Sequence, residues 1–232
     1  IDVGEKKATI VEDMDQIQAS LGIPAIFIEA RLDNTDEAYR TLGKILDREQ
    51  EGRALADYCR RTYQRSTELA AQIGDKPTLL YVGGAQGNMA VARGSFHAQV
   101  IDLLADNAAV VTEPTDGSMT QVSMEQVLAW NPQVLVIAAE SEPDFSALPW
   151  RELRVLQSGR VLRVPAEPYD WMGRPPSVNR LLGLSWLAAR LYPEQFGIDL
   201  NAEMKEYYRL FYHYELDDAA CAALLAEDRA RP

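Results

Sequence analysis

The chain has 232 residues, 47% of them hydrophobic, which is enough for one large domain or two small ones. Its formal net charge of −12 at pH 7 argues against a nucleic-acid-binding protein, because no basic patch is present to neutralise phosphates. No run of about 18 apolar residues occurs, so the sequence predicts no membrane-spanning helix. Only two cysteines are present, Cys59 and Cys221, and the sequence leaves open whether they pair.

The first 47 residues predict strands at 7–11 and 25–30, and helices at 13–21 and 35–46. This β-α-β-α order implies a parallel sheet, and two parallel strands do not form a stable sheet alone. We therefore expect residues 1–47 to be part of an N-terminal lobe that lacks its front. The start at Ile1, with no signal peptide before it, is typical of a processed or trimmed chain.

A long helix is predicted from Arg48 to Ile73, where no proline occurs. Its apolar side chains recur at helical spacing, and they are Leu55, Tyr58, Cys59, Thr62, Leu69 and Ile73. At full length this helix spans roughly 38 Å. Gly74 is expected to end it as a left-handed cap, and Pro77 to prevent its continuation. Such a helix is either a spine that joins two lobes or an ordinary long core helix.

After this helix the sequence alternates between strands and helices. Strands are predicted at 78–84, 110–112, 133–139 and 159–164, and helices at 96–105, 124–130, 150–155 and 178–191. The tail carries tyrosines at helical spacing, which we expect to pack a terminal helix against the lobe. The predicted fold is α/β, with two Rossmann-like lobes of mostly parallel sheet joined by the spine helix. The expected domains are 1–47 as the partial N-terminal lobe, 48–74 as the spine, and 75–232 as the C-terminal lobe.

Ligands of open α/β sheets bind beyond the carboxyl ends of the strands, which selects the loops to inspect. The predicted ligand-binding residues in these loops are Arg31, Gln86, Asn88, Ser95, His97, Tyr169, Trp171 and Arg174. The last three fall within six residues and precede a predicted helix. Backbone N–H groups at a helix start favour an anion, and a tyrosine and tryptophan pair offers a flat surface to a large, partly apolar ligand.

Enzyme interpretations find little support in the motifs. The segment GGAQGN at 83–88 follows a strand, but it matches neither the dinucleotide-binding nor the P-loop pattern and lacks the lysine. Ser95 and His97 lie two residues apart, so a helix would direct them away from each other, and no G-x-S-x-G motif occurs. Two histidines in the whole chain provide no histidine-rich metal site. We predict no catalytic residues, no metal and no cofactor. His97 is either a single ligand contact or a structural residue.

Several segments together resemble the class III substrate-binding proteins of ABC transporters, which receive ferric siderophores, haem, cobalamin and some bare metals or oxyanions. The segments that carry the resemblance appear in the family's order, and they are LGIPAIFI, TDEAYRTLGKIL, GSFHAQVIDLLADNAAV, VSMEQVLAWNPQVLVIA and WRELRVLQSGRVLRVP. Two later segments, DWMGRPPSVNRLLGLSWLAARLYPEQF and KEYYRLFYHYELDDAACAALL, resemble the iron-complex branch. The chain departs from the family in beginning inside the first lobe.

The resemblance implies an extracytoplasmic solute-binding protein, periplasmic or lipid-anchored, that holds an iron-chelate-type ligand between its lobes and delivers it to a membrane permease. It implies that the loop of Tyr169, Asp170, Trp171 and Arg174 faces the ligand. Two alternatives are a molybdate or tungstate receptor of the same family and a Rossmann-type nucleotide-binding enzyme domain. The identity of the ligand and the acidic residues that dock on the permease do not follow from the sequence. Because the first lobe is partial, we expect poor ligand affinity and self-association through residues 1–47.

Overall fold

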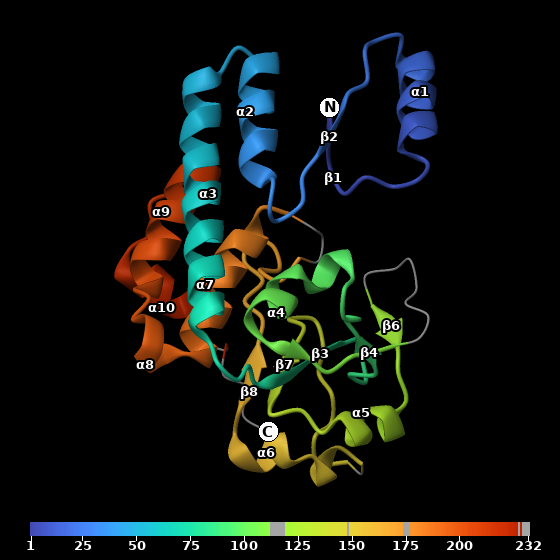
Figure 1. Cartoon of the computed structure of the whole chain (residues 1–232), viewed down its shortest axis with the longest axis vertical. Helices are drawn as coiled ribbons and strands as arrows, with labels where there is room; N and C mark the ends of the chain where they lie inside the picture. The colour runs from blue at the N-terminus through green and yellow to red at the C-terminus, as the bar shows by residue number, and fades with distance from the viewer. Residues whose placement is uncertain (112–118, 148, 174–176, 227, 229–232) are drawn as a thin grey trace. The chain divides into compact units, whose positions relative to one another are not determined.

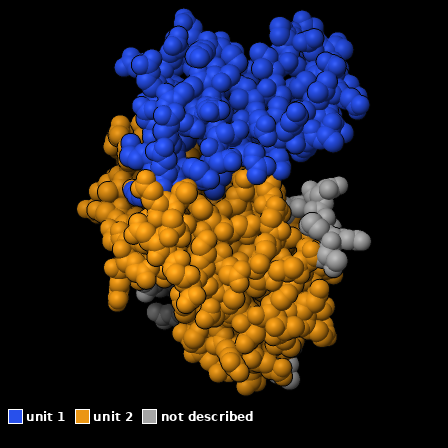
Figure 2. Space-filling model, in the orientation of Figure 1, with its two compact units in different colours: residues 1–65 blue, residues 66–232 orange. Residues whose placement is uncertain are grey.

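The computed structural model describes residues 1–111, 119–147, 149–173, 177–226 and 228 (Figure 1). The chain divides into two compact units, residues 1–65 and 66–232 (Figure 2). The boundary falls inside the long helix α3, Glu49–Gln72. The three-part division into 1–47, 48–74 and 75–232 stays a prediction.

Unit 1 contains a two-stranded parallel sheet of β1, Asp2–Gly4, and β2, Phe27–Glu29. Helix α1, Ile10–Leu21, connects the two strands. The strand predicted at 7–11 is therefore wrong, because residues 10 and 11 open a helix and the strand lies earlier. The first turn of α1 carries two carboxylates that suit a helix N-terminus, and Thr9 Oγ1 donates to Asp13 Oδ2 at 3.0 Å.

Helix α2, Thr35–Ile45, and the start of α3 approach each other closely within unit 1. A Cβ atom added to Gly52 would lie 2.7 Å from the carbonyl oxygen of Tyr39 and 2.8 Å from Cα of Gly43. Glycines at 43 and 52 therefore permit the two helix backbones to come together. The predicted long helix is confirmed within a residue at each end, but Gly74 does not adopt the expected left-handed conformation.

Unit 2 is built on one sheet of mixed direction with the order β6-β4-β3-β7-β8, and β5 pairs with β3 outside this path. Its strands are β3 Thr78–Gly83, β4 Met89–Ala90, β5 Asp106–Asn107, β6 Thr120–Gln121, β7 Val134–Ile137 and β8 Val161–Arg163. The pairs that β3 forms with β5 and β7, and β7 with β8, are parallel, whereas β4 and β6 join antiparallel. All four residues of β7 are buried, as expected for a strand covered on both faces.

The helices of unit 2 flank this sheet (Figure 1). They are α4 Gln99–Leu104, α5 Met124–Trp130, α6 Arg154–Ser158, α7 Asn179–Leu191, α8 Pro193–Phe196, α9 Leu200–Tyr212 and α10 Asp218–Leu224. Short 3-10 turns at Phe96–Ala98 and Trp150–Glu152 precede α4 and α6. A mixed α/β fold with a long helix is thus confirmed. Within the described ranges, no helix is both long and apolar enough to cross a membrane.

The strand predicted at 110–112 is wrong for Val110 and Val111, which lie in no strand; Thr112 is outside the described residues. The pairing strand is β5, and the Asn107 side chain explains why it ends there. Its Nδ2 donates to the carbonyl of Val91 at 3.2 Å, and its Oδ1 accepts from the Ala109 backbone N–H at 3.1 Å. The second bond occupies the backbone donor of Ala109, two residues beyond Asn107, so this donor is not left for the ladder.

The aromatic tail has the structural role predicted for it. Tyr207 is fully buried in α9, and its ring stacks on Phe211 with a centroid distance of 4.6 Å. Helix α9 packs on α7. The two cysteines, Cys59 and Cys221, are both buried and both free, so they form no disulfide.

Candidate functional site

Strands β3, β7 and β8 run parallel, so their carboxyl ends meet at one edge of the sheet. The described residues of the loops that leave this edge are 84–88, 138–147, 149 and 164–173 of unit 2. Ligands of open α/β sheets bind at such an edge. Four of the predicted site residues that the structure describes lie in or beside these loops, and a further pair lies in the segment before α4.

The loop after β3 is fixed by close packing at Gly87. This glycine has φ of +69°, and a Cβ there would lie 2.9 Å from the ring of Trp150 and 3.1 Å from Pro143. Only glycine suits both the conformation and the contact. Gln86 and Asn88 flank this turn; Gln86 is exposed and Asn88 is half-buried. Both side chains are therefore presented by a fixed backbone.

Asp170 organises the loop after β8. Its carboxylate is buried, and Oδ1 accepts from the backbone N–H of Met172 at 2.7 Å. Oδ2 accepts from the hydroxyl of Tyr81, in the central strand β3, at 3.1 Å. A buried carboxylate is retained only when its oxygens find such donors. Asp170 thus ties the loop to the sheet.

Asn179, at the start of α7, holds the same loop from the other side. Its Nδ2 donates to the carbonyl of Tyr169 at 2.9 Å, and its Oδ1 accepts from the hydroxyls of Tyr207 at 2.6 Å and Tyr212 at 2.7 Å. Burial raises the pKa of Tyr212, so its hydroxyl keeps the proton it donates. The Tyr169 side chain remains 54% exposed on this anchored backbone.

Trp171 does not lie as expected. We expected its ring to face solvent or a ligand, whereas the side chain is fully buried. Its Nε1 donates to the carbonyl of Glu167 at 3.0 Å, and its backbone N–H donates to Pro165. A large ring with its one polar group satisfied is more stable in the core than in water, which explains the difference. Arg174, another predicted ligand contact, lies outside the described residues.

His97 connects the segment before α4 to the loop after β8. Its Nδ1 lies 2.8 Å from the carbonyl oxygen of Gly173. A carbonyl oxygen only accepts, so this nitrogen carries the proton and donates. In the same segment Ser95 Oγ is buried and has no hydrogen-bond partner among the described residues. The structure therefore brings His97 to the loop that presents Tyr169, whereas the Ser95 hydroxyl makes no hydrogen bond to the described part of that loop and its place in a ligand site stays a prediction.

Arg31 belongs to unit 1. Its backbone N–H donates to Asn34 Oδ1 at 2.6 Å, and its Nε lies 3.7 Å from Asp33 Oδ1. Both charged side chains of this pair are about half exposed, so the pair adds little to stability. Arg31 is accessible within its own unit, and its part in a ligand site stays a prediction.

The chemistry of these loops suits noncovalent recognition. The loop after β8, which Asp170 and Asn179 hold in place, presents the aromatic ring of Tyr169, and the imidazole of His97 bonds to the same loop. Three or more side chains able to ligate a metal gather nowhere in the described part of the chain. Sequence reasoning missed the positioning role of Asn179, because its partners lie 10 to 33 residues away.

Comparison with known proteins identifies a family whose profile matches the chain. The profile described as "Periplasmic binding protein" matches residues 5–147 of this chain. Among curated proteins, the molybdate-binding protein MolA of Haemophilus influenzae is 34% identical over 118 residues. This alignment covers 47% of the chain and only 33% of MolA, so it spans a third of that relative's length.

Solved structures extend the similarity to nearly the whole chain. An ABC transporter solute binding protein from Sulfurospirillum deleyianum superposes with a TM-score of 0.85 and 25% identity, covering 97% of this chain and 71% of that one. A periplasmic solute binding protein from Veillonella parvula gives a TM-score of 0.78 and 25% identity, with 98% and 70% coverage.

Proposed function

Because the chain belongs to the periplasmic binding protein family, we propose that it is the solute-binding component of an ABC importer. In this role it binds a small solute in the periplasm and delivers it to a permease in the membrane. The observation that carries the proposal is the family match over residues 5–147. The similarity to two solute-binding proteins over nearly the full chain supports it. The role is transport, so the loops at the sheet edge are assigned to binding and not to catalysis.

For the cargo we propose an iron-chelate-type ligand, namely a ferric siderophore, haem or cobalamin. The exposed ring of Tyr169 supports this choice, because a flat aromatic surface suits a large, partly apolar ligand. The bonds that Asn179 and Asp170 make to its loop support it further, since a pre-organised contact loses little entropy on binding. His97 adds a polar group beside this loop.

A second candidate cargo is molybdate or a similar oxyanion. The similarity to the molybdate-binding protein MolA favours it. Such a small anion needs several hydrogen-bond donors at short distance and little aromatic surface. The Ser95 hydroxyl is buried and lacks a protein partner in the described residues, so we propose it as one donor to an enclosed anion.

A binding panel tests both the transport role and the choice of cargo. Isothermal titration calorimetry of the chain would use a ferric hydroxamate siderophore, haem, cyanocobalamin, sodium molybdate and ATP, each against sodium sulfate as a control for nonspecific anion binding. The account expects weak but saturable 1:1 binding of one chelate and no binding of ATP. Binding of molybdate but not sulfate or chelates would select the second candidate. Binding of ATP alone would contradict the transport role.

A further inference from the structure

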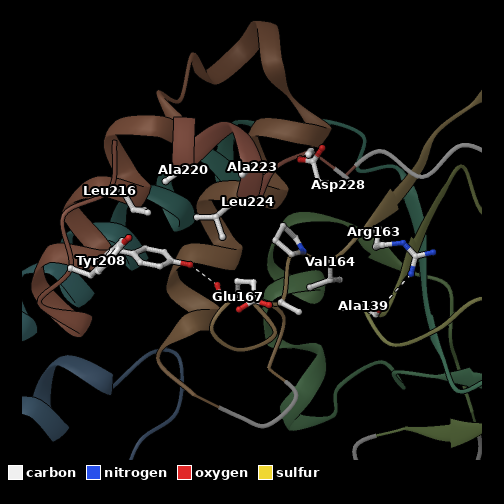
Figure 3. Close-up of a pocket in the computed structure, with 14 residues that line it drawn as sticks. Ala139, Arg163, Val164, Glu167, Tyr208, Leu216, Ala220, Ala223, Leu224 and Asp228 are labelled. Carbon is white, nitrogen blue, oxygen red and sulfur yellow. Dashed lines mark hydrogen bonds between the residues drawn. The ribbon is translucent and has the colours of Figure 1, made fainter. Parts of the chain in front are cut away.

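A pocket in unit 2 has none of the predicted cargo residues in its lining, although it shares the start of the loop after β8 with them. It has a volume of about 570 Å³, within the range typical of small-molecule sites. One wall is the start of the loop after β8, and the opposite wall is α10 with the segments on either side of it (Figure 3). Tyr208 of α9 closes one end, and Asp228 and Arg163 lie at the other.

Small apolar side chains leave this space open. Five alanines contribute to the lining, namely Ala139, Ala166, Ala220, Ala223 and Ala226. Leu216 and Leu224 extend the apolar surface over them. Larger side chains at these positions would fill the space, so the pocket exists because the alanine side chains are small. The interior therefore suits a compact apolar body and not an extended polar one.

The polar groups around the pocket are mostly engaged with the protein itself. The Asp228 carboxylate accepts from Trp186 Nε1 at 3.0 Å and pairs with Arg190. Arg163 Nη1 donates to the carbonyls of Ala139 at 3.2 Å and Ser141 at 2.7 Å. Figure 3 shows the Arg163 guanidinium directed away from Glu167.

Glu167 differs from these residues. Its backbone carbonyl accepts from Trp171 Nε1 at 3.0 Å and from the Tyr208 hydroxyl at 2.5 Å, which fixes its main chain. Its carboxylate makes no hydrogen bond or ion pair within the described part of the chain. Burial raises the pKa of Tyr208, so this hydroxyl remains a neutral donor and adds no charge. The carboxylate of Glu167 is therefore the anionic group that the pocket offers to a ligand.

From this combination we propose that the pocket is a second small-molecule site, separate from the proposed cargo site, for a compact apolar amine. The apolar body fills the alanine-lined space, and the ammonium group pairs with the carboxylate of Glu167. The net charge of −12 for the chain favours a cation over an anion at this position.

Three rigid cage compounds that share one apolar body and differ only in their head group provide the test. Binding of 1-aminoadamantane, 1-adamantanol and 1-adamantanecarboxylate to the whole chain would be measured at pH 7 by ligand-observed NMR titration. The amine should bind most tightly, by about two- to fivefold over the alcohol, because ion pairs with an exposed carboxylate contribute modestly. The carboxylate compound should bind most weakly. No binding of any compound, or the tightest binding for the carboxylate, would overturn the proposal.

Three variants locate the site. Glu167→Gln keeps the backbone carbonyl that Trp171 and Tyr208 use, and should remove the preference for the amine while the alcohol still binds. Ala223→Leu should block all three compounds, whereas Ala222→Leu, an exposed residue of α10 outside the lining, should not. Equal binding by the two leucine variants would place the compounds elsewhere and contradict the proposal.

A competition experiment separates this site from the cargo site. Molybdate and the ferric siderophore are added to the chain with 1-aminoadamantane already bound. The amine should stay bound, whether or not either solute binds. Displacement of the amine at a concentration that saturates the cargo site would show that the two sites are one, and would overturn the inference without affecting the transport role.

Discussion

Asn179 accepts hydrogen bonds from the hydroxyls of Tyr207 and Tyr212 and donates one to the carbonyl of Tyr169. The amide is fully buried, so water cannot reach it, and these bonds satisfy its polar atoms instead. The sequence predicts a helix that includes this residue, but not its partners, because they belong to a loop and to another helix. The sequence predicts Tyr169 as a site residue but does not predict the residue that positions it.

Asn179→Ala should lower the free energy of unfolding of the chain by about 2–3 kcal/mol, because it leaves two tyrosine hydroxyls without this acceptor. Urea denaturation followed by circular dichroism measures the change. In a double variant with Tyr207→Phe the loss should be smaller than the sum of the two single losses, since one hydroxyl no longer needs a partner. Strict additivity of the two substitutions would show that this hydrogen bond contributes nothing.

Individual helices and strands show which sequence patterns are sufficient to predict an element. The sequence predicts helix α5 with its correct ends, because Ser123 is an N-cap residue and Asn131-Pro132 stops the helix; the structure adds that Ser123 and Gln126 form a capping box. The apolar run at 7–11 was assigned to a strand, and it starts a helix instead. Short apolar runs do not distinguish the two structures, and the acidic residues of the first turn favour the helix.

The close approach of α2 and α3 gives a prediction for Gly52. Gly52→Ala should destabilise unit 1 by about 1–3 kcal/mol, because the added methyl group meets backbone atoms that cannot move aside. Alanine favours a helix over glycine, so the loss must arise from the contact. Gly74→Ala is the matched control, since a Cβ there meets nothing within 4 Å. Equal stability of the two variants in urea denaturation would contradict the close packing.

Helix α1 gives a prediction about association. Val11 is 65% exposed and Leu21 is 63% exposed, and the neighbouring two-stranded sheet also exposes Val3. We expect the chain to self-associate through residues 1–47, as exposed apolar residues and an open sheet edge favour. The double variant Val11→Glu, Leu21→Lys should be monomeric in light scattering after gel filtration. Val110→Lys, which removes an exposed apolar residue from unit 2, should associate like the unmodified chain. A monomeric unmodified chain would contradict the expectation.

At the scale of the whole molecule, the α/β class, the long helix and the buried parallel strands followed from sequence, because their periodicity extends over many residues. The two-residue strands β4, β5 and β6 did not, since they depend on pairing and not on their own residues. The candidate site was predicted as a set of loops. Its local order, with Trp171 buried and Tyr169 exposed, depends on tertiary packing that no local pattern encodes.

The measurement that tests the central claim most directly is the affinity of the Tyr169→Ala variant for the chelate that the unmodified chain binds. Tyr214→Ala is the matched control, because its ring is 57% exposed but lies outside the cargo loops. Loss of the Tyr169 ring should weaken chelate binding by about three- to tenfold in calorimetry, the range for one aromatic contact, with an unchanged melting temperature. The control should bind like the unmodified chain. Equal chelate affinity of both variants would contradict the assignment of the cargo site to this loop.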